Sequence, residues 1–203
     1  MRFCCQMAGV HHGRERLLYV ADSTNRIWQV SAPDGAQQAQ FTAPKPNPYP
    51  LAVTDGVLWG LSDGQNFGQK MLYALDASTG SELWHTTTIN GQGLNTLVSA
   101  AGVIYNAGLT SDGHNSAVTS WDARTGVPGW QRSWKGLPAQ GAPLAFGPGT
   151  LLIGIRQTLC ALNAATGKEQ WQLTLDGAIS TIEVDGALAY VLTGQGRIYA
   201  IQL

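Results

Sequence analysis

The chain has 203 residues with a formal net charge of −1, and 44% of its residues are hydrophobic whereas only 12% are charged. The hydrophobic share excludes wholesale disorder, and the near-zero charge without a basic stripe excludes nucleic acid as an expected partner. No apolar run reaches the roughly 18 residues of a membrane span, no signal peptide is expected, and three cysteines make no disulfide framework.

The composition predicts strands and tight turns. The chain contains 25 glycines, about 12% of its residues, against a usual share of roughly 7%. Its surface residues are mostly Gly, Ser, Thr, Asn and Gln, which suit strands and turns better than the Lys-rich and Glu-rich faces of soluble helices. We therefore expect an all-β fold.

The first predicted unit covers about residues 3–42. Its opening segment, Phe3–Val10, has two interpretations: it is the first strand of this unit, or it is an outer strand that closes a ring with the last unit. After this unit, Thr42–Pro50 holds four prolines and predicts a stiff extended connector.

Three units with four strands each are predicted next, at about 49–89, 95–135 and 142–176. In each, a glycine-bearing turn precedes an apolar strand, as in Asp55-Gly56-Val57-Leu58-Trp59, which reads as a hairpin. The last unit, about 179–203, has a hairpin and a third strand but no fourth strand. The chain is thus predicted to be one domain, 1–203, of about five units.

An eleven-residue element that ends in tryptophan marks the later part of each complete unit. It is Ala74–Trp84 in the second unit, Ser120–Trp130 in the third and Ala161–Trp171 in the fourth. A degenerate copy, Gln29–Ala39, keeps the glycine but has alanine in place of tryptophan. The glycines stand at positions 35, 80, 126 and 167, at intervals of 45, 46 and 41 residues. Four strands at this spacing are typical of a β-propeller blade.

The residue types of the element explain its structure. Asp or Asn can accept hydrogen bonds from turn amides, and Gly adopts a backbone conformation that residues with a Cβ resist. Trp buries on the order of 150–250 Å². Because one blade cannot bury its own faces, the repeated Trp is expected to pack against the neighbouring blade.

The pattern Ala-x-Asp-x-x-Thr-Gly-x-x-x-Trp resembles the tryptophan-docking motif of propellers of the pyrroloquinoline-quinone (PQQ) type. That family includes quinoprotein alcohol dehydrogenases, BamB-like envelope lipoproteins and sensor domains of receptor kinases. The resemblance, over about Leu17–Leu203, implies docking rings at Trp84, Trp130 and Trp171. It implies turn glycines at Gly80, Gly126 and Gly167, and small platforms at Ala74, Ser120 and Ala161. It also implies a location in the cell envelope or outside the cytoplasm.

Five units allow two arrangements, a small closed ring or an open arc that is part of a longer propeller. Propellers have about four to eight blades, so the number of units does not decide between them. An open arc would expose two blade faces and invite self-association.

Two loops between a second and a third strand are candidate sites for a polar ligand. They are Ser62–Asn66 and Ser111–Asn115, and both follow the pattern Ser-Asp-Gly-x-Asn. The side chains that would face the ligand are Asp63, Asn66, Asp112, His114 and Asn115. Functional residues favour such loops, but Asp-Gly is also an ordinary hairpin turn. The carboxylates are too few for a calcium loop, and no metal site is predicted.

Cys4-Cys5 is a weak candidate for cofactor binding. In the PQQ-dependent dehydrogenases that the chain resembles, two adjacent cysteines form a disulfide over the cofactor. Here the pair can also be two small apolar residues of an edge strand. The sequence shows no Asp-x-Asp pair or Glu–Asn set that would supply a base and calcium ligands, so no catalytic residue is predicted.

The sequence therefore predicts a non-catalytic propeller domain without a cofactor. It would act as a binding, sensor or scaffold module for a protein partner or a small polar ligand. One alternative is a fragment of a PQQ-dependent dehydrogenase that binds PQQ and calcium. Another is a truncated reading frame without a function of its own.

Overall fold

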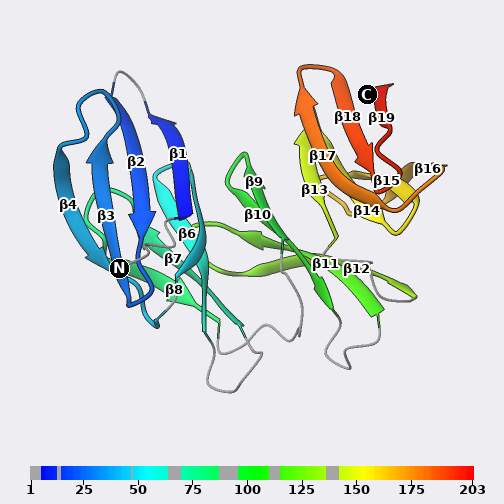
Figure 1. The fold of residues 1–203 in the computed structure, drawn as a ribbon. Coiled ribbons are helices and arrows are strands. Elements are labelled where there is room, and N and C mark those ends of the chain that lie inside the picture. Colours follow the sequence, from blue (N-terminus) through cyan, green and yellow to red (C-terminus); the bar gives the residue numbers. More distant parts are fainter. Residues whose placement is uncertain are drawn as a thin grey trace. The chain divides into compact units, whose positions relative to one another are not determined.

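The computed structural model describes residues 6–12, 15–46, 48–63, 70–86, 96–109, 115–135 and 142–203. Every regular element in these residues is a β-strand, and all pairs of strands are antiparallel (Figure 1). This confirms the predicted all-β class. No helix in the described residues could cross a membrane.

The strands form sheets whose members follow one another along the chain. Sheet 1 contains β1 (Gln6–His12), β2 (Glu15–Ala21), β3 (Arg26–Ser31) and β4 (Gln37–Thr42). Sheet 2 contains β5 (Tyr49–Thr54), β6 (Val57–Asp63), β7 (Lys70–Asp76) and β8 (Glu82–His85). Sheet 3 contains β9 (Thr96–Ala100), β10 (Val103–Leu109), β11 (Asn115–Asp122) and β12 (Pro128–Lys135).

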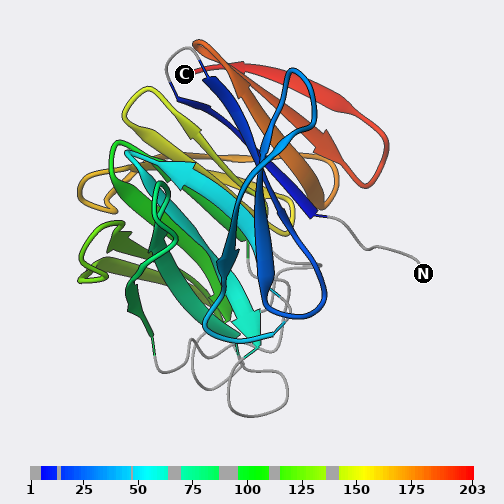
Figure 2. The same ribbon diagram turned by 90° about the vertical axis from the view of Figure 1, so that its left-hand side faces the viewer.

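Sheet 4 contains β13 (Leu144–Gly147), β14 (Thr150–Ile155), β15 (Thr158–Asn163) and β16 (Glu169–Thr174). Sheet 5 contains β17 (Ile179–Asp185), β18 (Leu188–Thr193) and β19 (Ile198–Gln202), and it is three-stranded in the described residues. Figure 2 shows these strands in orange and red, with β19 at the edge of its sheet.

The structure decides between the two interpretations of the N-terminal segment. β1 pairs with β2 along its whole length, from Gln6 opposite Ala21 to His12 opposite Glu15. In the described part of Phe3–Val10, the segment is therefore the first strand of its own sheet.

The predicted bounds of the connector, Thr42–Pro50, are wrong at both ends. Thr42 is the last residue of β4, and Tyr49 and Pro50 begin β5. Proline is tolerated there because β5 is an edge strand of sheet 2, and its pairing with β6 shifts between Tyr49 and Leu51. An edge strand does not need the amide proton that proline lacks.

The chain divides into two compact units. The first comprises Met1–Ile89, Ala101–Val103 and Asp122–Val127, and the second comprises Asn90–Ala100, Ile104–Trp121 and Pro128–Leu203. Sheets 1 and 2 thus belong to the first unit, and sheets 4 and 5 to the second.

Each unit has an apolar core between the faces of two consecutive sheets. In the first unit, Tyr19, Ala21 and Ile27 of sheet 1 pack with Leu58, Tyr73 and Leu75 of sheet 2. In the second unit, Leu152, Leu159 and Ala161 of sheet 4 pack with Ile182, Ala189 and Val191 of sheet 5. These side chains come from alternate strand positions, because successive residues of a strand point to opposite faces.

Candidate functional site

One acidic or amide side chain organises each turn of the repeated element. Asp76 Oδ1 accepts hydrogen bonds from the backbone amides of Ser78 and Thr79, at 2.9 and 3.0 Å. It also accepts the hydroxyls of Ser78 and Thr79, at 2.6 and 3.2 Å. Hydrogen bonds from the Ser78 side chain and the Thr79 backbone favour the charged form and lower the pKa of Asp76 to about 2.

The same turn recurs with Asp122 and with Asn163. Asp122 Oδ1 accepts the amide and the hydroxyl of Thr125, at 2.7 and 2.8 Å. Asn163 Oδ1 accepts the same two groups of Thr166, both at 3.0 Å. The prediction that Asp or Asn accepts turn amides is confirmed, and the neutral amide of Asn163 accepts the same two groups as the carboxylate of Asp122.

Trp84 of β8 docks on the next copy of the element, within the first compact unit. Its Nε1 donates to the Ala123 carbonyl at 2.9 Å. Its indole lies over Gly126, where φ is +70° and an added Cβ would stand 2.5 Å from Trp84 Cδ2. Glycine is required here for both the backbone conformation and the space.

Trp130 of β12 makes the same contact within the second compact unit. Its Nε1 donates to the Ala164 carbonyl at 2.9 Å, and its ring lies over Gly167. Tyr105 adds a second donor, because its hydroxyl lies 3.2 Å from the same carbonyl. Trp171 of β16 stands opposite Ala161 and packs against the core of sheets 4 and 5.

Sheet 1 has no tryptophan at the position of Trp84, but other residues make the contact with the following turn. The sequence analysis missed these residues. Ala39 occupies the tryptophan position, and Phe41 lies over Gly80 instead: an added Cβ at Gly80 would stand 2.6 Å from Phe41 Cγ. The Ala77 carbonyl, equivalent to those of Ala123 and Ala164, accepts the Tyr19 hydroxyl at 3.0 Å and the Gln29 amide at 3.1 Å.

The polar groups of the repeated element are thus used to join turns and neighbouring sheets. Arg132 contributes in the same way in the second unit: its Nη2 lies 2.7 Å from Glu169 of β16, and its guanidinium lies over the Trp134 ring.

The candidate loop residues predicted from sequence are only partly described. Asp63 is the last residue of β6, and Asn115 is the first residue of β11, where it is half-buried and paired with Lys135. The side chain of Asp63 and the whole of Asn66, Asp112 and His114 lie outside the described residues. Cys4 and Cys5 also lie outside them.

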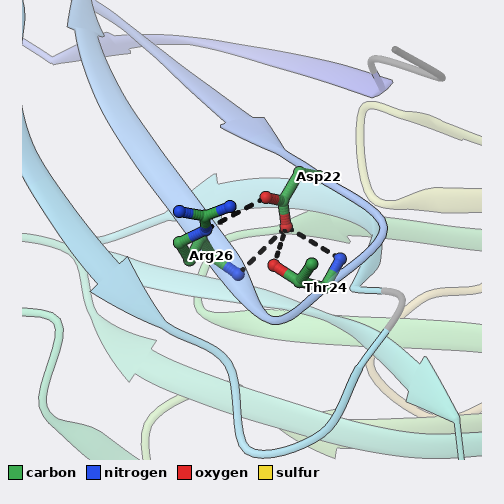
Figure 3. Close-up of polar contacts among 3 residues, drawn as sticks. All are labelled: Asp22, Thr24 and Arg26. Carbon is green, nitrogen blue, oxygen red and sulfur yellow. Dashed lines mark hydrogen bonds and ion pairs between the residues drawn. The ribbon is translucent and has the colours of Figure 1, made fainter. Parts of the chain in front are cut away.

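The equivalent loop of sheet 1, Asp22–Arg26, is fully described (Figure 3). Asp22 Oδ1 accepts the backbone amides of Thr24 and Arg26, at 2.9 and 3.3 Å, and also the Thr24 hydroxyl. Arg26 Nε donates to Asp22 Oδ2 at 3.2 Å. Burial alone would raise the pKa of Asp22, but these hydrogen bonds and the Arg26 charge outweigh it, so the pKa is lowered.

This loop is an ordered and exposed polar surface. Ser23 and Thr24 are exposed, as is 51% of the Arg26 side chain, whose guanidinium also lies over the Trp28 ring, 5.4 Å from its centroid. The loop escaped the sequence analysis because Ala-Asp-Ser-Thr-Asn does not match the Ser-Asp-Gly-x-Asn pattern. The signal that could have found it is the position of Asp22 directly after the second strand.

Sheet 5 has a related ion pair in the corresponding place. Thr193 N donates to the Arg197 carbonyl as Asp22 N donates to the Arg26 carbonyl, so Arg197 is the equivalent of Arg26. Arg197 Nη1 lies 2.6 Å from Asp176 Oδ2. Arg26, the first residue of β3, and Arg197, directly before β19, are thus each held by a carboxylate, but Asp22 follows β2 whereas Asp176 precedes β17.

No cluster of potential metal ligands is found in the described part of the chain. Cys160 is buried in β15 with a free thiol. Burial, together with the nearby Glu169 charge, raises the pKa of this thiol to about 11. Cys160 therefore acts as an apolar core residue at neutral pH.

A family model described as "Outer membrane protein assembly factor BamB" matches residues 14–118 and 114–203. The two regions cover nearly all of the chain and include every copy of the repeated element. The comparison with curated proteins found no relative that matches the chain.

Solved structures share the fold at low sequence identity. The computationally designed Ika8 protein is 14% identical with a TM-score of 0.70; the match covers 96% of this chain and 57% of Ika8, less than two thirds of its length. The designed Ika4 protein is 17% identical with a TM-score of 0.58, over 77% of this chain and 91% of Ika4. Hydrazine synthase from Kuenenia stuttgartiensis is 13% identical with a TM-score of 0.70, over 92% of this chain and 68% of that one. At these identities the likeness concerns the fold alone.

Proposed function

Since this chain belongs to the BamB-like family of PQQ-type β-propeller repeat proteins, we propose that it is a non-catalytic module that binds another protein. Its sheets would be propeller blades, about five in number, and its binding surface would be the loops between the second and third strands. The Asp22–Arg26 loop is one of the described members of this surface.

The family description supports a protein partner. It names an assembly factor, and such a factor acts on other polypeptides. The use of the repeated residues agrees with this. Asp76, Asp122 and Asn163 hold their own turns, and Trp84 and Trp130 bind the following turn. The repeat therefore builds a scaffold, and recognition is left to the loops that it carries.

The single observation that carries the proposal is the way Asp22 holds the loop. One carboxylate fixes two backbone amides, one hydroxyl and the Arg26 guanidinium. A loop ordered in this way loses little conformational entropy when it binds. Arginine is enriched at protein interfaces because its planar group offers several donors, and Arg26 can direct them to carboxylates or backbone carbonyls of a partner.

A site-specific photo-crosslinker at Ser23 tests this role in the cells that encode the protein. We expect it to capture a defined polypeptide, and we expect Arg26→Ala to reduce the capture by about fivefold or more, equivalent to about 1 kcal/mol. The matched control is a crosslinker at Ala36, which is exposed in the turn at the opposite end of β3. Equal capture at both positions would refute a binding surface at this loop.

The non-catalytic part of the proposal has its own test. The purified chain is mixed with PQQ and Ca²⁺, and the absorption spectrum and dye-linked oxidation of alcohols are measured. We expect neither a bound-quinone spectrum nor oxidation above the rate of free PQQ. A stoichiometric quinone spectrum with turnover would show that the chain is part of a dehydrogenase.

A further inference from the structure

The linker Leu175–Ile179, between β16 and β17, holds two loops of the second compact unit. One is the turn between β14 and β15, where the carbonyls of Arg156 and Gln157 accept backbone amides from the last and the first residue of the linker, at 2.6 and 2.8 Å. The other is the loop between β18 and β19, where Gly194 N donates to the Ala178 carbonyl at 2.7 Å. One short segment therefore fixes both loops.

Each of these two loops presents an exposed arginine. Arg156 has a φ of +55°, in the left-handed region that residues other than glycine and asparagine rarely adopt. Such backbone conformations cluster at binding and active sites. Arg197 Nη1 lies 2.6 Å from Asp176 Oδ2 of the linker, and 69% of the Arg197 side chain is exposed. The linker thus positions two cationic side chains at the surface of one unit.

Arginine recurs in the equivalent loop of the first unit. With Arg26, an exposed arginine stands in each of the three loops between a second and a third strand that the structure describes in full. In both ion pairs the carboxylate is the less exposed member: Asp22 is 10% exposed against 51% for Arg26, and Asp176 is 28% exposed against 69% for Arg197. A partner at these loops therefore meets guanidinium groups before it meets the carboxylates that hold them.

The turns at the other end of each sheet carry the opposite charge. In a sheet of consecutive antiparallel strands, the turns from first to second and from third to fourth strand lie opposite the loops from second to third strand. In the described residues, the turns hold four exposed aspartates and two exposed bases, namely Asp34, Asp55, Asp122, Asp185, Arg124 and Lys168. An acidic partner is therefore attracted to the loops and repelled by the turns.

We propose that the linker Leu175–Ile179 and its two loops form a binding site for an acidic segment of another protein, whose carboxylates accept hydrogen bonds from Arg156 and Arg197. This inference rests on the proposed function, because it names the kind of polypeptide that the loops bind. A guanidinium can donate two parallel hydrogen bonds to one carboxylate. Asp176 contacts Arg197 through Nη1, so Nε and Nη2 are the donor pair for the partner. Because the linker already fixes both loops, binding costs little conformational entropy.

The composition of the site favours a protein segment over an anionic membrane surface. Electrostatic binding to anionic lipids takes clusters of roughly four to eight Lys or Arg residues, whereas here two arginines stand beside the carboxylate of Asp176. The exposed amides of Gln157 and Gln195 add donors and acceptors that suit the main chain of a peptide.

A photo-crosslinker at Gln157, an exposed residue of the site, tests the proposal on the purified full chain. The probe is a labelled peptide of alternating glutamate and glycine, and its reference is the same peptide with glutamine in place of glutamate. We expect the glutamate peptide to be captured at least about tenfold better than the glutamine peptide, and less well at high salt. We expect Arg156→Gln together with Arg197→Gln to lower this capture by about tenfold, or about threefold for each exposed ion pair.

The matched control is Lys168→Gln, which removes a positive charge from the exposed turn between β15 and β16 of the same unit and should leave the capture unchanged. Circular dichroism checks that each variant is folded, and Arg197→Gln alone replaces the double variant if that variant is not. The proposal is wrong if both peptides are captured equally, or if Lys168→Gln acts as the double variant does. It is also wrong if vesicles of phosphatidylglycerol bind the chain through these arginines while the glutamate peptide is not captured.

Crosslinking at Gln157 and Ser23 in the cells that encode the protein separates this inference from the proposed function. If a cellular polypeptide is captured but the purified chain does not prefer the glutamate peptide, the proposed function stands and the acidic segment is refuted. If the purified chain prefers the glutamate peptide but no cellular polypeptide is captured at either position, the charge preference stands and the proposed protein partner is refuted.

Discussion

At the scale of single residues, the acidic or amide group of each turn gathers donors that a tight turn would otherwise leave unpaired. Asp76 accepts two backbone amides and two hydroxyls within three residues of itself. Asn163 accepts one amide and one hydroxyl of Thr166 without a charge. The carboxylate is therefore needed for its acceptor oxygen, and its charge adds a dependence on pH.

Variants at Asp76 separate these two contributions. The folded-state pKa of Asp76, about 2, lies below the ordinary value of 3.8, so its stabilising effect is present above about pH 4 and is lost as the pH falls toward 2. We expect Asp76→Ala to lower the free energy of unfolding at pH 7 by about 1 kcal/mol. We expect Asp76→Asn to cost less at pH 7 and to reduce the loss of stability between pH 4 and pH 2.

Urea titrations at a series of pH values from 7 to 2 measure this effect. Asp122 has a lowered pKa for the same reason, through its hydrogen bonds with Thr125, so part of the acid sensitivity should remain in Asp76→Asn. An unchanged acid sensitivity in that variant would show that the hydrogen bonds of Asp76 do not stabilise the folded state.

At the scale of elements, the contact between consecutive sheets is conserved in form while its residues change. Trp84 and Trp130 supply both a flat ring over glycine and a donor to an alanine carbonyl. In sheet 1 these tasks are divided, because Phe41 supplies the ring and Tyr19 with Gln29 supplies the donors. The contact therefore requires an aromatic ring over the glycine and a hydrogen-bond donor to the alanine carbonyl, and residues other than tryptophan can supply both.

A double-mutant cycle on Tyr19 and Gln29 tests this division. Each single variant, Tyr19→Phe or Gln29→Leu, leaves one donor on the Ala77 carbonyl but breaks the 2.9 Å hydrogen bond from Gln29 Nε2 to the Tyr19 hydroxyl, so each should cost about 1 kcal/mol. The double variant leaves that carbonyl without either side-chain donor and should cost about 1 kcal/mol more than either single variant. Chemical denaturation measures the four free energies, and a double variant as stable as either single variant would contradict the division of the donors between Tyr19 and Gln29.

From the sequence we could predict those elements whose characteristic residues all lie within one short segment. Gly80, Gly126 and Gly167 stand at fixed positions within a local turn, so a repeated motif is enough to locate them. Phe41 could not be predicted, because it lies two residues past the tryptophan position and its partner Gly80 is brought to it by another sheet. The Asp22 loop was missed for a related reason: its hydrogen bonds tolerate a sequence unlike those of the other loops.

At the scale of the whole molecule, the sequence predicted similar sheets of consecutive strands repeated along the chain. The structure shows such sheets, divided between two compact units. Sequence alone could not show which sheet faces are covered. Leu159 and Ile198 are both apolar residues of a third strand, yet one is fully buried and the other mostly exposed. Burial at such a position depends on a neighbouring sheet, which the segment itself does not encode.

The rate at which the Cys160 thiol reacts with a reagent measures how often the second unit unfolds. The thiol is buried between β14 and β16, and its pKa of about 11 leaves little thiolate at neutral pH. In a variant with Cys4→Ser and Cys5→Ser, Cys160 is the remaining cysteine. We expect its reaction with a thiol reagent at pH 8 to be at least about 100-fold slower in the folded chain than in urea.

The control adds Cys160→Ser and Ser180→Cys, which places the thiol at an exposed position of β17. This thiol should react at a similar rate with and without urea. If Cys160 reacts as fast as the control in the folded chain, the core of sheets 4 and 5 opens far more readily than its packing implies.

The self-contained turns have a consequence for how such chains change in length over evolution. Within the described residues, the side-chain hydrogen bonds of Asp76 and Asp122 reach residues two or three positions away, so each acceptor and its donors lie in one short segment. A duplicated gene segment of one repeat interval would bring with it both a docking ring and a glycine turn to receive one. Unequal recombination can therefore insert or delete a whole repeat without requiring a new interface to evolve.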